Sequence, residues 1–288
     1  MKALTPAQVR GYHHDGYLFP VEGLRADEVR HYLAAVSDIE THAGAPLPVG
    51  DKRWRSAAYL YSRRFYELAC HPRILDAVED VIGPDILAYM ATFFIKEPGG
   101  PAFTAWHQDS TYFGLDPHEH VTAWIALTDA TEQAGCMEVL SARGAARQLH
   151  HKNAYLPHSI NGAGQVIVEP LDESGAVAMQ LAAGQFSLHN TLCCHRSAPN
   201  RAAHRRIGWG VSYIPARVRT TGSHRMYGVL VRGRNEPGNF DLLPAPKGEL
   251  EPEAMAVHER FFLRWRENYV EQERMHARQF AEAVPAQT

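Results

Sequence analysis

Apolar positions near the start of the chain recur at helical spacing. A helix is predicted from about Asp27 to Thr41, before Gly44, by the apolar series Val29, Leu33, Val36 and Ile39. The opening Thr5-Pro6-Ala7-Gln8 has the form of a capping box with proline at the first helical position. A third helix is predicted over Pro72–Ile82, stopped by Gly83-Pro84. The first third of the chain is therefore expected to be helical.

The pattern changes near Ile86. Short apolar runs then alternate with Gly, Pro, Asn and Asp until about Tyr213, which is typical of a sandwich or barrel of short strands. The clearest runs are Leu87–Ile95, Val121–Leu127, Gln165–Val168, Val177–Leu181, Gln185–Leu188 and Ile207–Ile214.

A charged tail from Glu251 to Val284 is predicted to form one long helix or two. Helices followed by many strands and then a helix favour a mainly β fold, a barrel buttressed by N- and C-terminal helices, over a parallel α/β sheet. We expect a single domain over 1–288: a helical region over 1–85, a barrel core over 86–215, an irregular excursion over 216–250 and a C-terminal helix over 251–288. The apolar face of that last helix is expected to pack on the domain, with a dimer contact as the alternative.

Composition narrows the class of protein. A formal net charge of −3 is unlike the strongly basic balance of non-specific nucleic-acid binders, so no nucleic-acid partner is expected. No apolar run approaches the ~18 residues of a membrane span, and the first residues lack a secretory signal. The four cysteines form no CxxC pair and are expected to be reduced thiols. These features predict a cytoplasmic protein, monomeric or homodimeric.

The segment Trp106-His107-Gln108-Asp109 carries the first candidate chemistry. On a strand, residues two apart face the same side, so His107 and Asp109 would point together while Gln108 turned away. An HxD triplet by itself is more often a surface histidine beside a solvated aspartate. His195, far along the chain, would complete a face of two imidazoles and one carboxylate. Such a face leaves coordination positions open and is typical of non-haem iron(II) oxygenases, whereas zinc more often takes a closed set of ligands.

Several motifs in order then resemble the phytanoyl-CoA dioxygenase family, over roughly residues 8 to 215. They are Phe94-Ile95-Lys96-Glu97-Pro98-Gly99, Trp106-His107-Gln108-Asp109, Val121–Thr131, Gly135–Leu140 and His195–Arg206. The resemblance implies a double-stranded β-helix, a cupin-like jelly roll, and an enzyme that uses Fe(II), 2-oxoglutarate and O2. Such an enzyme is expected to oxidise a small molecule, an amino acid derivative or a natural-product intermediate, most simply by hydroxylation, with release of succinate and CO2. Desaturation, epoxidation or cyclisation with the same cofactors are alternatives.

The resemblance also implies residue roles. His107, Asp109 and His195 would hold the iron and form the catalytic centre. Arg206 would grip the far carboxylate of 2-oxoglutarate, for which a guanidinium is a planar, permanently charged partner. Ser197 would share this grip. Trp124 and Lys96 match positions near the cosubstrate, although Lys96 could equally be a solvated strand end.

Strand alternation adds to these assignments. If Arg206 points inward, so do Gly208, Gly210 and Ser212, which would leave room for a ligand, while Arg205 faces out with the packing residues. By the same rule an inward Lys96 would bring Thr92 toward the cosubstrate.

Three rival interpretations remain. An iron halogenase replaces the carboxylate ligand with a small residue, against which Asp109 argues. A hydrolase or isomerase holding a non-redox metal and a non-enzymatic cupin-like binding protein are the others. The loop Leu140–Ala145 departs from the Pro-Gly-Ser-His stretch of many relatives, so no relative's substrate is transferred.

Other conspicuous residues are expected to be structural or solvated. These are His13-His14 at the end of the first helix, His150-His151 in a loop, and the thiols Cys193 and Cys194. The group Arg217, Arg219, His224 and Arg225 is expected to be solvated, with a place at the mouth of the site, where it would meet an acidic substrate, as the alternative. His118 and His120 have a better chance of lining a pocket.

Overall fold

A computed structural model of the chain describes residues 1–154, 156–161 and 164–282. Its α-helices are α1 (Pro6–Asp15), α2 (Ala26–Ala43), α3 (Arg63–Ala69), α4 (Pro72–Ile82) and α5 (Pro252–Glu282), with short 3-10 turns η1 (Lys52–Arg55), η2 (Ala58–Leu60), η3 (Asp109–Tyr112) and η4 (Glu173–Gly175). The predicted capping box is present: the Gln8 backbone N–H donates to Thr5 and the Thr5 backbone N–H donates to the Gln8 side chain. The short helix α3 was not predicted.

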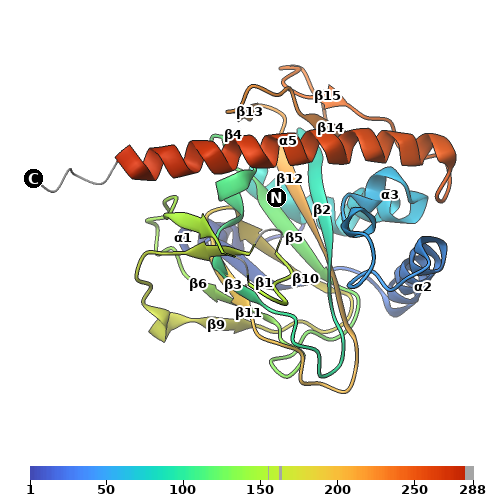
Figure 1. Cartoon of the computed structure of the whole chain (residues 1–288), viewed down its shortest axis with the longest axis horizontal. Helices are drawn as coiled ribbons and strands as arrows, with labels where there is room; N and C mark the ends of the chain where they lie inside the picture. Colours follow the sequence, from blue (N-terminus) through green and yellow to red (C-terminus); the bar gives the residue numbers. More distant parts are fainter. Residues whose placement is uncertain (155, 162–163, 283–288) are drawn as a thin grey trace, which may run out of the picture.

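Eight strands build two facing antiparallel sheets. One contains β2 (Ile86–Lys96), β5 (Val121–Ala126), β10 (Gln185–Asn190) and β12 (Arg206–Pro215), in the order β10-β5-β12-β2. The other contains β3 (Thr104–His107), β6 (Met137–Leu140), β9 (Val177–Met179) and β11 (Cys194–Ser197), in the order β3-β11-β6-β9. Because the chain passes repeatedly between the two sheets, the arrangement is a jelly roll, which confirms the predicted fold class (Figure 1).

Further strands extend this core. The edge strand β1 (Tyr17–Glu22) pairs with β10, in a region that we expected to be helical. Its Pro20 masks the strand pattern, since proline in a sheet is confined mainly to edges. The expected irregular excursion over 216–250 is also corrected: it contains β13 (Arg219–Thr220), β14 (Tyr227–Arg232) and β15 (Asp241–Leu242), and β14 joins the larger sheet beside β2. Three more short strands are β4 (Leu115–Asp116), β7 (His151–Asn153) and β8 (Gln165–Ile167).

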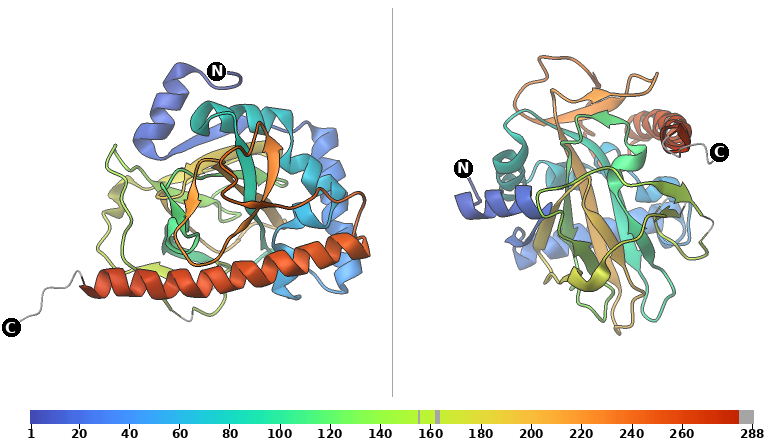
Figure 2. Two further views of the ribbon diagram at one scale, coloured as in Figure 1. Left: turned by 90° about the horizontal axis from the view of Figure 1, so that it is seen from above. Right: turned by 90° about the vertical axis from the view of Figure 1, so that its left-hand side faces the viewer.

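The main hydrophobic core lies on the outer face of the larger sheet, under the N-terminal helices. Ile207, Trp209, Val211 and Tyr213 of β12 belong to it, as alternation predicts, and the rings of Trp209 and Phe65 on α3 lie 5.2 Å apart. On another side α5 runs along the molecule, with the sheets between it and α1 (Figure 2). The core therefore leaves the inner face of the larger sheet free for a site.

No helix in the described ranges has the length and apolar character needed to cross a membrane.

Candidate active site

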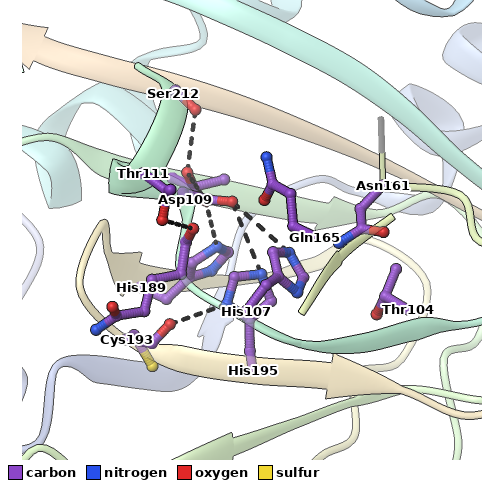
Figure 3. A network of polar contacts seen from close by, with 12 residues as sticks. Thr104, His107, Asp109, Thr111, Asn161, Gln165, His189, Cys193, His195 and Ser212 are labelled. Carbon is purple, nitrogen blue, oxygen red and sulfur yellow. Dashed lines mark hydrogen bonds and ion pairs between the residues drawn. The ribbon is translucent and has the colours of Figure 1, made fainter. Parts of the chain in front are cut away.

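Two paired strands bring the two predicted histidine ligands together. In the antiparallel ladder between β3 and β11, His107 is the direct partner of His195, and their ring centroids lie 4.1 Å apart. With Asp109 they offer three ligand atoms that all lie within 4.8 Å of one another (Figure 3). Nε2 of each histidine is 3.9 Å from Oδ1 of Asp109, close enough for one ion bound at ~2.1 Å from each atom.

We predicted that Asp109 would lie on the same strand as His107, but it lies just beyond the end of that strand. Strand β3 ends at His107, and Asp109 begins the turn η3. Gln108 keeps an extended backbone, with φ −121° and ψ 141°, so the alternation of sides continues one residue beyond the ladder. Its side chain points away, as predicted, and donates to the backbone oxygens of Arg147 at 2.8 Å and Leu192 at 2.7 Å.

Hydrogen bonds fix both imidazoles with Nε2 directed at the shared point. Nδ1 of His107 lies 2.8 Å from the Ala105 oxygen, and Nδ1 of His195 lies 3.0 Å from the Cys193 oxygen. A carbonyl can only accept, so Nδ1 carries the proton and Nε2 keeps its lone pair. Burial lowers the pKa of His107, and burial with the His107 imidazole lowers that of His195 to about 3. Neutral imidazoles are the form that binds metal.

The second oxygen of Asp109 is held by residues that sequence reasoning missed. Thr122 Oγ1 donates to Oδ2 at 3.2 Å and lies 3.0 Å from Ser212 Oγ, while His189 Nε2 is 3.5 Å from Oδ2. Burial alone would raise the pKa of Asp109, but the His189 hydrogen bond and the three neighbouring imidazoles outweigh it and lower that pKa. Asp109 is therefore a carboxylate, and its Oδ1 faces the two Nε2 atoms.

At another part of the cavity lies the buried cation Arg206. Its Nη1 donates to the Gly135 oxygen, and its guanidinium carbon lies 5.3 Å from the Trp124 ring centroid. Nε makes no hydrogen bond, and among the described residues no carboxylate pairs with this side chain. Burial lowers the pKa of Arg206 to about 10. A buried charge without a counter-ion is costly, so the arrangement is suited to an anionic ligand.

Lys96 is the register partner of Arg206 and is completely buried. Its Nζ donates to Ser197 Oγ at 2.7 Å, to the Gly135 oxygen at 3.2 Å and to the Ala198 oxygen. Three acceptors match an ammonium, yet burial and the nearby Arg206 charge lower the pKa of Lys96 to about 6. At neutral pH this lowered pKa favours the neutral amine of Lys96. It does not line the cavity, but it holds Ser197, which does.

The room for a ligand that we predicted beside Gly208, Gly210 and Ser212 of β12 is only partly present. A Cβ at Gly208 would lie 1.9 Å from the Trp124 ring, so the indole fills the space that we expected beside this glycine. Gly210 and Ser212 do line the cavity, together with Thr92 and Trp124. Arg205 lies outside, as predicted, where Nε is 2.7 Å from Glu97 Oε1 and Nη1 is 2.9 Å from Glu40 Oε2.

The three ligand residues and Arg206 line one cavity of about 740 Å³. His107, Asp109, His195, Ser197 and Arg206 form its inner part. Its outer part comes from segments far apart in the sequence: η1 contributes Arg55, and α5 contributes Phe262, Trp265 and Tyr269. Asn161 and Gln165 face the cavity beside the triad (Figure 3). The helix α5 is thus both a packed face, through the buried Phe261, and a wall of the site.

The residues that we expected to be structural or solvated do not line this cavity, and neither do His118 and His120. His13, His14, His118, His120, Arg217, Arg219, His224 and Arg225 are outside its lining. His151, expected in a loop, lies at the start of β7, and its Nε2 accepts from the Gln108 backbone N–H at 2.9 Å. The four cysteines, Cys193 and Cys194 included, are free. His189 could have been considered from the sequence, because it lies only six residues before His195. It is on β10, where its register partner is Thr122 on β5.

A jelly roll that directs two imidazoles and a carboxylate into an interior cavity has the architecture of the non-haem iron, 2-oxoglutarate-dependent oxygenases. The chain belongs to the phytanoyl-CoA dioxygenase (PhyH) family of these enzymes, whose model matches residues 12–208. Among curated protein sequences none matches the chain.

Solved structures with a similar fold include three non-heme enzymes. The apo form of ThoJ, described as a non-heme monooxygenase, is 29% identical, with a TM-score of 0.80 over 92% of this chain and 98% of ThoJ. CytC3 with Fe(II) and alpha-ketoglutarate is 22% identical, with a TM-score of 0.64 over 87% of this chain and 98% of CytC3. The epimerase SnoN, in complex with Fe3+, alpha ketoglutarate and nogalamycin RO, is 22% identical, with a TM-score of 0.61 over 75% of this chain and 85% of SnoN. The last two likenesses bear on the fold alone.

Proposed function

We propose that this protein is an Fe(II)- and 2-oxoglutarate-dependent dioxygenase that hydroxylates a small molecule and releases succinate and CO2. The observation that carries the proposal is the pairing, in one cavity, of a three-ligand group with a buried arginine that has no counter-ion among the described residues. The first suits Fe(II), and the second suits the far carboxylate of 2-oxoglutarate.

His107, Asp109 and His195 would hold the iron. Both histidines offer Nε2 with the proton kept on Nδ1, and Asp109 offers Oδ1. Bound iron supplies the oxygen chemistry that converts 2-oxoglutarate to succinate. The chain supplies a fixed ligand geometry and a sheltered cavity.

Arg206 would hold the distal carboxylate of 2-oxoglutarate, with Ser197 Oγ as a second partner. Lys96 would act from behind by orienting the Ser197 hydroxyl, which also lies 2.9 Å from Thr104 Oγ1. Trp124 fixes the guanidinium through its ring face, and Thr92 forms part of the cavity wall next to Gly210. An arriving anion would therefore find its cationic partner already oriented.

The reaction on the substrate has alternatives that use the same cofactors, namely desaturation, epoxidation and cyclisation. Related folds include a monooxygenase, ThoJ, and an epimerase, SnoN, so the outcome is set by how the substrate sits. Halogenation is disfavoured because Asp109 fills the ligand position that a halide would need.

A screen for substrate-stimulated succinate release tests the function. Purified protein would be incubated with Fe(II), 2-oxoglutarate, O2 and a metabolite library. Succinate should appear only when iron, 2-oxoglutarate and O2 are all present. Turnover of a compound without O2 would instead indicate a hydrolase or isomerase with a non-redox metal.

A further inference from the structure

The outer part of the cavity contains an arginine that belongs neither to the three-ligand group nor to the pocket proposed for 2-oxoglutarate. Arg55, at the end of η1, lines the same cavity as the triad and is half-buried. Among the described residues it makes no hydrogen bond and no ion pair. Burial lowers the pKa of its guanidinium. Its neighbour Arg53 differs, because its guanidinium is paired with Asp51 at 2.7 Å.

The backbone that carries Arg55 is held in place from two sides. Ser56 forms an isolated bridge with Thr92 on β2, and the Ala57 backbone N–H donates to the Ala91 oxygen at 2.7 Å. From α5, Nε2 of the buried His258 lies 2.8 Å from the Ser56 oxygen. The arginine therefore stands on a fixed base at the boundary of the sheet and α5, as a preorganised binding group does.

This arginine is distinct from the one proposed for 2-oxoglutarate. Thr92, beside Ser56, and Lys96, opposite Arg206, are four residues apart on β2, which is about 13 Å along a strand. The two cations thus occupy different levels of the cavity.

The other residues that line the cavity around Arg55 indicate which kind of ligand would fit there. Apolar and aromatic side chains of two elements line this cavity, namely Phe262, Trp265 and Tyr269 on α5 and Met90 and Phe94 on β2. Tyr269 is itself fixed by stacking on Tyr112, with ring centroids 4.6 Å apart.

Polar and charged groups also line the cavity. Asn161, beside the triad, has a buried Nδ2 that has no hydrogen-bond partner among the described residues and can donate. The exposed Lys52 and Arg266 also line the cavity, against Glu273 and the already paired Asp51. The outer cavity thus favours an anion with a flat apolar body.

We propose that the substrate is a carboxylic acid with a flat apolar body, whose carboxylate is bound by Arg55 while that body lies between α5 and β2. This inference rests on the proposed function, since it assigns the substrate class of the same site. A guanidinium that gains a carboxylate in a partly desolvated cavity forms a charge-assisted, bidentate contact, and Lys would reproduce only part of it.

A direct test uses a matched pair of probes, naphthalene-2-carboxylate and naphthalene-2-carboxamide. Equilibrium dialysis would measure their binding to the Fe(II) enzyme without O2, with saturating 2-oxoglutarate to occupy Arg206. The wild type should prefer the acid by about tenfold or more, which is ~1.4 kcal/mol. Arg55→Gln should abolish this preference, Arg55→Lys should retain part of it, and the control Arg53→Gln should leave it intact.

Equal binding of acid and amide, no measurable binding of the acid, or a preference that survives Arg55→Gln would overturn the proposal. The activity screen separates this outcome from failure of the proposed function, because that failure would be an absence of succinate release with every compound.

With an acidic substrate found in the screen, Arg55→Gln should raise the half-saturation concentration for that substrate by about tenfold or more. Saturation by the cosubstrate 2-oxoglutarate should stay unchanged in the same variant. Weaker saturation by the cosubstrate instead would assign Arg55 to 2-oxoglutarate and overturn the proposal.

Discussion

Nε2 of His189 lies 3.5 Å from Oδ2 of Asp109, so it contacts the oxygen that does not face His107 and His195. Thr122 donates to the same oxygen. One oxygen of the carboxylate is thus held by β5 and β10, and the other is left for a metal. Groups that orient a ligand in this way commonly change metal affinity by ten- to hundredfold.

We therefore expect His189→Leu to weaken Fe(II) binding by about ten- to hundredfold while the protein stays folded. His189→Gln can still donate to Asp109 and should recover part of the affinity. Metal titration of the purified variants measures this directly, without depending on turnover. An unchanged affinity in His189→Leu would show that Thr122 alone orients the carboxylate.

Each of the variants His107→Ala, Asp109→Ala and His195→Ala should lose iron binding and activity, because a single site needs all three donors. Iron content after loading and succinate release are the two readouts. His118→Ala, outside the cavity lining, is the matched control and should keep both. Wild-type activity in Asp109→Ala would refute the triad.

Asp109→Gly should likewise lose hydroxylation, and a chlorinated product from that variant would be an additional sign of an opened ligand position.

Alternation along an extended segment predicted that His107 and Asp109 share a face, whereas His195 as a ligand and the role of Arg206 were implied by the resemblance to the family's motifs. His107 and Asp109 are two residues apart, and alternation along β12 separated Arg206 from Arg205 correctly. The same alternation failed at Gly208, because it cannot tell that an indole from the neighbouring strand fills the gap.

The outer cavity could not be predicted for a related reason. Arg55 and Tyr269 line the same cavity only because the fold brings η1 and α5, which are far apart in the sequence, to it. No local periodicity records which helical face will line a cavity and which will join the core: Phe261 and Phe262 are adjacent, and they divide between these two roles.

Lys96 should make the stability of the metal-free protein depend on pH. Its pKa falls from 10.5 to about 6 on folding, so between these values the unfolded state binds more protons, and stability contributed at this position rises with pH. The wild type should therefore gain stability relative to Lys96→Met as pH increases across this window, by up to ~1.4 kcal/mol per pH unit. Urea unfolding of both proteins at several pH values measures the difference. A constant difference would show that Lys96 stays protonated in the folded protein.

Arg206 and Arg205 are adjacent on the chain and have opposite surroundings. Arg206 is buried in the cavity without a counter-ion among the described residues, whereas Arg205 pairs outside with Glu40 and Glu97. Removing a bidentate partner from a buried carboxylate typically costs several kcal/mol, because the remaining charge is left unpaired. Arg206→Ala should thus raise the half-saturation concentration for 2-oxoglutarate by about a hundredfold or more, while Fe(II) still binds.

Two further variants make this last prediction specific. Arg206→Lys should recover only part of the cosubstrate binding, since a point charge cannot reproduce the fork of the guanidinium. Arg205→Ala is the matched control: its lost ion pairs are partly exposed, so it should leave 2-oxoglutarate saturation nearly unchanged. Cosubstrate titration of the three variants under equal iron and oxygen decides the matter. A large defect in Arg205→Ala with a small one in Arg206→Ala would assign the cosubstrate to the opposite face of β12.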